Sequence, residues 1–117
     1  MQSHITHTEI LVASKDPMWD KKLKICSDLW LHDVRANYLQ DSDINIDSII
    51  RTCRKQKIKL LVVLKESWYS QGRVKVWDVS KNMEIDETLD RLTETLIRML
   101  QIIKSHIEKD LRRAVTT

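Results

Sequence analysis

The chain has 117 residues, the size of a single domain, with 42% hydrophobic residues and a net charge of +3. No apolar run approaches the roughly 20 residues that span a bilayer, and the first residues lack the basic-then-apolar pattern of a signal peptide. A single glycine excludes the glycine-rich loops with which nucleotide-binding enzymes hold phosphates.

Hydrophobic patterning predicts strands that alternate with helices. Short apolar or alternating runs indicate strands, whereas apolar residues at intervals of three and four indicate helices. Residues 1–8 are a polar lead-in, and we expect one domain over residues 9–117. The predicted elements are strands over residues 9–13, 35–39, 60–64 and 74–79, and helices over residues 18–31, 46–55 and 83–113.

This order of elements predicts an α/β fold. Two helices that each connect one strand to the next imply a mixed, mostly parallel sheet of about four to five strands with helices on its faces. Gly72 is expected in the turn that returns the chain to the last predicted strand.

The first two predicted helices each have one apolar face. We expect Trp19 and Trp30 in the core, with the lysines of the first helix off its apolar face. Cys26 and Cys53 are expected to be buried, reduced thiols, which together with the lack of a targeting segment predicts a cytoplasmic protein. Asp43 is a suitable cap for the second helix.

The predicted closing helix has apolar residues at alternating intervals of four and three, the a/d spacing of a coiled-coil seam. At 1.5 Å per residue it would be roughly 42–45 Å long and would overhang its own domain. The exposed end would serve self-association as a homodimer or docking on a neighbouring domain; a helix bent over the sheet is the alternative. The residues assigned to the seam are Leu89, Leu92, Leu96, Met99, Ile103 and Ile107.

Positive charge is concentrated in residues 48–81, which hold nine Lys or Arg (51, 54, 55, 57, 59, 65, 73, 75 and 81) against Glu66 and Asp78. A helix that ends in positive charge can follow a phosphate backbone by counterion release; a merely solvated face is the alternative. Trp68 and Tyr69 could stack on unpaired bases, or one could cover the sheet edge, and Trp77 could face outward. The candidate RNA-binding residues are Arg51, Arg54, Lys55, Lys57, Lys59, Trp68, Tyr69, Arg73 and Lys75.

Catalytic and metal-binding patterns are missing from the sequence. The four histidines, at positions 4, 7, 32 and 106, do not have metal-ligand spacing. Ser67 and Ser70 have no base nearby in sequence. We therefore expect no enzymatic activity, metal or cofactor in this chain.

Several segments resemble the anticodon-binding domain of class II aminoacyl-tRNA synthetases, and histidyl-tRNA synthetase in particular. The resemblance covers about residues 9–103. The segments are the Leu29-Trp30 pair, the run Tyr38-Leu39-Gln40-Asp41, the Cys53-Arg54 pair followed by Ile58-Lys59-Leu60-Leu61-Val62, and Val74-Lys75-Val76 after the hairpin.

Within this group the chain is most similar to the synthetase-like regulatory region of general control nonderepressible kinases. These kinases phosphorylate a translation initiation factor when uncharged tRNA accumulates. Synthetases usually place a glycine between the first helix and second strand, where this chain has Leu31, His32 and Asp33, and their last helix is shorter. Both departures favour a non-catalytic copy.

The resemblance implies an anticodon-binding-like three-layer fold and a function. The expected function is a non-catalytic tRNA-binding and dimerisation module of a stress-sensing serine/threonine kinase that responds to amino-acid starvation. A protein–protein docking module without RNA binding and the anticodon-binding domain of an active histidyl-tRNA synthetase are the alternatives.

Overall fold

The computed structural model describes residues 8–41 and 44–116, with side chains described as far as Ile107. The chain begins with two β-α units, as the sequence predicts. In order, the elements are β1 (Ile10–Ser14), α1 (Trp19–Trp30), β2 (Ala36–Tyr38), α2 (Ile46–Lys55), β3 (Leu60–Leu64), α3 (Glu66–Tyr69), β4 (Arg73–Asp78), β5 (Met83–Thr88), a 3-10 turn (Leu89–Arg91) and α4 (Leu92–Thr116).

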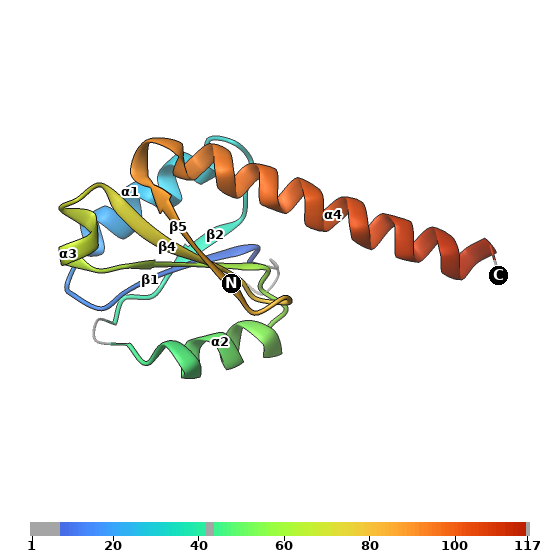
Figure 1. Cartoon of the computed structure of the whole chain (residues 1–117), viewed down its shortest axis with the longest axis horizontal. Coiled ribbons are helices and arrows are strands. Elements are labelled where there is room, and N and C mark those ends of the chain that lie inside the picture. Colours follow the sequence, from blue (N-terminus) through green and yellow to red (C-terminus); the bar gives the residue numbers. More distant parts are fainter. Residues whose placement is uncertain (1–7, 42–43, 117) are drawn as a thin grey trace, which may run out of the picture.

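The five strands form one mixed sheet in the order β2-β1-β3-β4-β5. β1 pairs in parallel with β2 and β3, whereas the β3–β4 and β4–β5 pairs are antiparallel. Helices α1 and α4 cover one face of the sheet and α2 covers the other (Figure 1). The expected three-layer α/β fold is confirmed.

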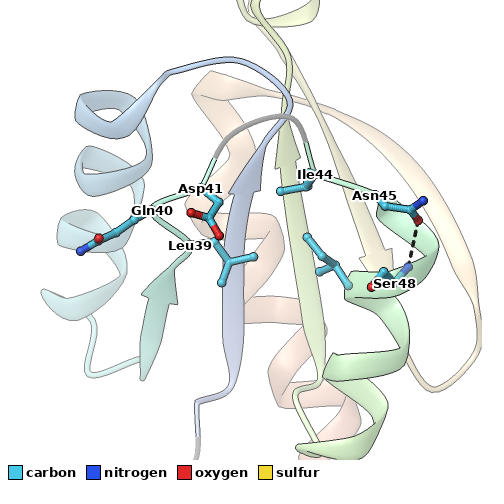
Figure 2. Close-up of a pocket in the computed structure, with 7 residues that line it drawn as sticks. Leu39, Gln40, Asp41, Ile44, Asn45 and Ser48 are labelled. Atoms are coloured by element: carbon cyan, nitrogen blue, oxygen red, sulfur yellow. Dashed lines mark hydrogen bonds between the residues drawn. The ribbon is translucent and has the colours of Figure 1, made fainter.

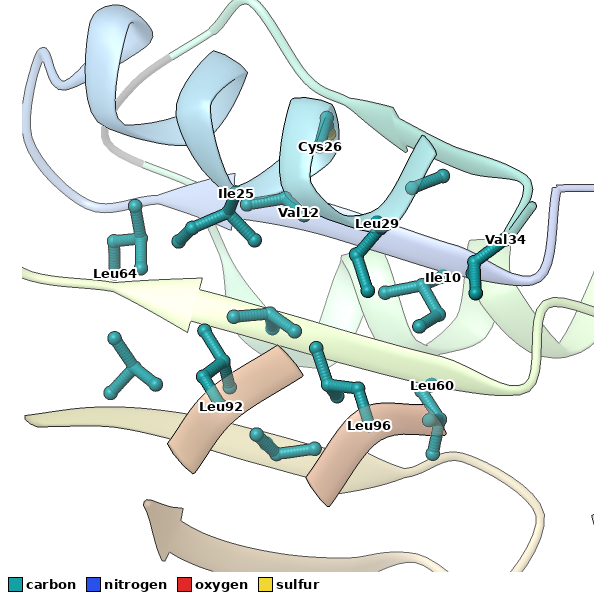
Figure 3. Packing of buried hydrophobic residues seen from close by; sticks show 14 of the residues in the cluster. Ile10, Val12, Ile25, Cys26, Leu29, Val34, Leu60, Leu64, Leu92 and Leu96 are labelled. Carbon is teal, nitrogen blue, oxygen red and sulfur yellow. The ribbon is translucent and has the colours of Figure 1, made fainter. Parts of the chain in front are cut away.

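Two apolar clusters lie on the two faces of the sheet. The larger cluster packs α1 and α4 against inward-facing residues of β1, β3 and β4, among them Ile10, Val12 and Leu60 (Figure 3). The smaller cluster packs Ile50 and Cys53 of α2 against the opposite face. Strands β1 and β3 are buried along their whole length because helices cover both of their faces.

Residues 83–88 are a strand, so the prediction of one helix over residues 83–113 is wrong at its start. Asn82 adopts a left-handed conformation (φ 53) that closes a hairpin between β4 and β5. Asp78 stabilises this turn, since its Oδ1 accepts hydrogen bonds from Ser80 Oγ and the Lys81 amide. As a result β4 is an interior strand, and Trp77 is buried rather than facing outward.

Helix α1 is rotated about its axis relative to the predicted orientation. Trp19 is 63% exposed and Trp30 is 45% exposed, so the expectation that both lie in the core is wrong. Trp30 Nε1 instead donates to the Ala36 carbonyl at 2.9 Å. Lys22 is fully buried, and its ammonium donates to the carbonyls of Leu39 and Asp41. The aliphatic stem of a lysine can pack in a core when its charged end reaches such acceptors.

The first half of α4 packs on its own sheet. Leu92, Leu96 and Leu100 are buried in the larger cluster, and Met99 and Ile103 are half-buried against it. Helix α4 then extends well past the body of the domain (Figure 1), and the chain with this helix measures 51 Å in its longest dimension. The predicted overhang is therefore present.

The seam prediction is wrong for its central residues, because Leu92 and Leu96 are covered by the domain itself. Leu89 lies in the 3-10 turn and packs against the same cluster. Ile107 is 42% exposed and continues the buried stripe beyond the body. In the described part of the chain, no helix is long and apolar enough to cross a membrane.

Candidate functional site

The exposed side of α2 and the turn after it carry five basic side chains, here called the α2 basic surface. Four are exposed and Lys59 is half-buried. Within residues 8–41 and 44–107, none of the five forms an ion pair. Their charge is therefore available to an anionic partner. The α2 basic surface consists of Arg51, Arg54, Lys55, Lys57 and Lys59.

The local sequence builds this surface by fixing both ends of α2. Asn45 caps the first turn by accepting the Ser48 amide at 3.1 Å; Asp43, the predicted cap, lies outside the described residues. At the other end, the Ile58 amide donates to the Cys53 carbonyl and the Lys57 amide to the Arg54 carbonyl. These two bonds form a Schellman motif, the hydrogen-bond pattern that commonly ends a helix.

Lys57 occupies the left-handed position of this motif, with φ 62. Glycine is usual there, because a side chain costs about 1 kcal/mol or more in this conformation. The Lys57 side chain is nevertheless exposed and has no ion pair among the described residues. Residues in such strained backbone conformations cluster at functional sites, so Lys57 is a candidate binding residue.

The remaining predicted RNA-binding residues lie at the opposite end of the sheet. Lys59 precedes β3, whereas Trp68 and Tyr69 follow it in α3, so the five-residue strand separates the two groups by roughly 15 Å. Trp68 packs against the smaller cluster and Tyr69 against the larger one. The two aromatic residues therefore cover the end of the sheet, and the single predicted site is divided into two.

Lysines lie over both of these aromatic rings. The ammonium groups of Lys65 and Lys75 lie 5.6 and 5.3 Å from the centre of the Trp68 ring. Lys21 lies 5.5 Å from the centre of the Tyr69 ring. Cation–π contacts of this kind hold the rings in place.

Lys75 is not available to an anion, contrary to the prediction. Its ammonium bonds Glu84 at 2.8 Å and Asp86 at 3.0 Å, both on β5. These hydrogen bonds raise the pKa of Lys75 above its ordinary value. Arg73, two residues earlier on β4, is exposed and has no ion pair in the described ranges.

The hairpin brings a further basic residue, Lys81, to the α2 end of the sheet. The sequence does not predict Lys81 as an RNA-binding residue. The Val79 amide donates to the Lys59 carbonyl at 3.1 Å, which places the start of the hairpin beside the α2 basic surface. Lys81 is exposed in that hairpin. The only feature of the sequence that indicates a role for Lys81 is its place in the basic stretch of residues 48–81.

A crevice lies where β2 ends and α2 begins (Figure 2). In open α/β sheets, ligands often bind where the chain leaves neighbouring strands toward opposite faces. Here the lining includes Asp41 and Asn45, whereas the nearby Lys22 ammonium is engaged by backbone carbonyls. Burial lowers the pKa of Lys22, and the nearby Asp41 carboxylate partly opposes this effect. The crevice therefore lacks the free cations of the α2 basic surface.

The two cysteines are buried and unpaired, as predicted. Burial raises the pKa of each thiol to about 11, so neither Cys26 nor Cys53 forms a reactive thiolate at neutral pH. Across the described residues, no group of three or more His, Cys, Asp or Glu side chains could hold a metal ion.

The comparisons with known proteins agree with this architecture. The chain is 29% identical over 80 residues to the probable serine/threonine-protein kinase ifkB of Dictyostelium discoideum, covering 68% of this chain and 6% of the kinase. It is 30% identical over 92 residues to a probable cytoplasmic histidine–tRNA ligase of Vairimorpha ceranae, covering 78% of this chain and 21% of the ligase. The chain thus spans less than a quarter of either relative.

A solved structure shares the fold. The histidyl-tRNA synthetase of a Nostoc species superposes with a TM-score of 0.73 at 17% sequence identity, covering 81% of this chain and 23% of the synthetase. Residues 5–114 match the family described as the anticodon binding domain of tRNAs. The chain belongs to this anticodon-binding domain family.

Proposed function

We propose that this chain is a non-catalytic module that binds tRNA through the α2 basic surface. The observation that carries the proposal is a set of five basic side chains on one helix and its following turn, with no ion pair among the described residues. Membership of an anticodon-binding family supports tRNA as the anion.

Binding through this surface would be electrostatic. Basic side chains that replace the counterions of a phosphate backbone gain free energy from counterion release. Such contacts position an RNA and do not read its sequence. The proposed site therefore binds weakly, with a strong dependence on salt and little dependence on sequence.

We further propose that the parent protein is a serine/threonine kinase that responds to uncharged tRNA during amino-acid starvation. The similarity to the kinase ifkB supports this assignment. The same similarity extends to histidine–tRNA ligases, so the anticodon-binding domain of an active ligase is the competing assignment. The sequence that precedes this domain in the parent gene distinguishes them, because a kinase domain and a synthetase core differ in their motifs.

A second candidate function is assembly through the distal part of α4. Ile107 is exposed and continues the stripe that packs Leu96 and Ile103 against the domain. An apolar stripe that leaves the body of a domain is suited to a second copy or a neighbouring domain of the parent.

The direct test of RNA binding is a salt titration. Fluorescence anisotropy with an end-labelled, deacylated tRNA should give a plot of log K against log salt with a slope of roughly −2 to −4, since each phosphate contact contributes about −0.7 to −0.9. A slope near zero, or no binding at 50 mM salt, would reject this function and leave the docking module as the better account.

A further inference from the structure

Strand β5 forms one edge of the sheet. It pairs with β4 on its inner side, and no strand within residues 8–41 and 44–116 pairs with its outer side. Alternate residues of an edge strand direct their backbone N–H and C=O groups outward, where they can pair with an added strand.

An apolar groove, here called the β5 groove, lies between this edge and α4. Its volume is about 170 Å³, which suits a single aliphatic side chain. Met83 is 54% exposed and Ile102 is 49% exposed, although both are large and apolar. The β5 groove is lined by Met83, Ile85, Met99, Ile102 and Ile103, with Asp78 and Lys81 also at its wall.

The other face of β5 is acidic. Because side chains alternate along a strand, Glu84 and Asp86 lie on the face opposite Ile85, on the same side as Lys75. Lys75 bonds Glu84 Oε2 and Asp86 Oδ1. One ammonium faces two carboxylates, so the three side chains together keep a net negative charge. The second oxygen of each carboxylate has no hydrogen-bond partner among the described residues.

Strand β4 already shows which pattern fits beside β5. Val74 and Val76 lie on the face packed by α4, and Lys75 lies between the two carboxylates on the other face. We propose that the outer edge of β5 binds an extended peptide in which aliphatic and basic residues alternate, added as a sixth strand. One of its aliphatic side chains would enter the β5 groove, and its basic side chains would approach Glu84 and Asp86.

Charge disfavours a second copy of this chain as the occupant. Pairing two β5 edges antiparallel in one continuous sheet would place Glu84 and Asp86 of one copy beside the same carboxylates of the other. Like charges opposite one another destabilise a strand pair. A basic partner is therefore favoured, and this inference does not depend on RNA binding by α2.

The test uses the 117-residue chain and the blocked heptapeptide Lys-Val-Lys-Val-Lys-Val-Lys. NMR titration should shift the amides of β5 and of residues 99–103. Two N-methylated peptides test the strand pairing: one is methylated at the backbone nitrogens of the lysines and the other at those of the valines. One of them should not bind and the other should keep its affinity within about threefold, because only one edge of the peptide strand faces β5. The peptide with Glu in place of Lys should not bind.

Protein variants localise the binding. Ile102→Glu should lower the affinity for the peptide at least tenfold and leave the affinity for RNA unchanged. Leu31→Glu, at another exposed apolar position, should change neither affinity. Both residues are exposed, so circular dichroism should show folded variants. Absence of binding, equal effects of the two N-methylated peptides, an unchanged affinity of Ile102→Glu, or a β5-linked dimer in sedimentation would each overturn the proposal.

Discussion

Lys104 of α4 bonds the buried carboxylate of Glu9, with 2.7 Å between Lys104 Nζ and Glu9 Oε2. The other oxygen, Oε1, accepts the Arg35 amide at 3.0 Å, so Glu9 connects the entry of β1 to both β2 and α4. Burial by itself would raise the pKa of Glu9, but these hydrogen bonds and the charges of Lys104 and Arg35 outweigh it and lower the pKa. This ion pair fixes α4 near the point where it leaves the domain.

Lys104→Ala should reduce the free energy of unfolding by about 1 kcal/mol at neutral pH, because it leaves the buried Glu9 carboxylate without its cation. The loss should be no larger, since Lys104 itself is exposed to solvent. The lowered pKa of Glu9 means that its contribution is present above pH 4.5 and is lost as the pH falls through the folded value. Urea denaturation at pH 3 and pH 7 should therefore show a smaller pH dependence in the variant. Arg98→Ala, which removes an exposed pair with Glu94, is the control and should change stability by less than about 0.5 kcal/mol.

Lys57→Gly should separate stability from function. Glycine adopts φ 62 without strain, so the variant should be about 0.5–1 kcal/mol more stable in thermal or urea unfolding. The same change removes one charge from the α2 basic surface and should weaken tRNA binding. A variant that is more stable and binds tRNA as well as the wild type would show that Lys57 has no role in binding.

Lys75→Met should leave tRNA binding within about twofold, since the Lys75 ammonium is already bonded to Glu84 and Asp86. Lys55→Met is the matched control on the α2 basic surface and should reduce both the affinity and the steepness of its salt dependence. An equal loss in the two variants would mean that RNA reaches the opposite end of the sheet as well.

Leu96→Glu and Ile107→Glu should behave differently. Leu96 is fully buried, so a glutamate there should unfold the domain and cannot report on assembly. Ile107 is exposed, and Ile107→Glu should keep the wild-type melting temperature. If the distal stripe joins two copies, light scattering should show a dimer for the wild type and a monomer for Ile107→Glu. A monomeric wild type at tens of micromolar would leave docking on a neighbouring domain as the use of Ile107.

The sequence predicts the interior strands and α2 well because their apolar periodicity is unambiguous. Helix 46–55 and strand 60–64 have the predicted bounds. Residues 83–88 mislead because Ile85 and Leu89 also fit the spacing of the following helix. Only pairing with β4 makes residues 83–88 a strand rather than the start of the helix, and the local sequence pattern does not reveal that pairing.

The site was predictable only where charge alone defines it. The cations of α2 follow from helical spacing, since positions 51, 54 and 55 share one side of a helix. The neutralised Lys75 was not predictable once β5 had been missed, because both of its acidic partners lie on that strand. Lys22 was missed because its acceptors, the carbonyls of Leu39 and Asp41, lie 17 and 19 residues away along the chain.

The most direct test of the proposed function compares two triple charge reversals with the same change in net charge. One variant carries Arg51→Glu, Arg54→Glu and Lys55→Glu on α2. The other carries Lys24→Glu, Arg91→Glu and Arg98→Glu, which are exposed positions on α1, the 3-10 turn and α4 at the other face of the sheet. Dissociation constants for deacylated tRNA would be measured at one fixed salt concentration. We predict that the α2 variant loses at least tenfold in affinity and that the control stays within about threefold; an equal loss in both, or an unchanged α2 variant, would contradict binding through the α2 basic surface.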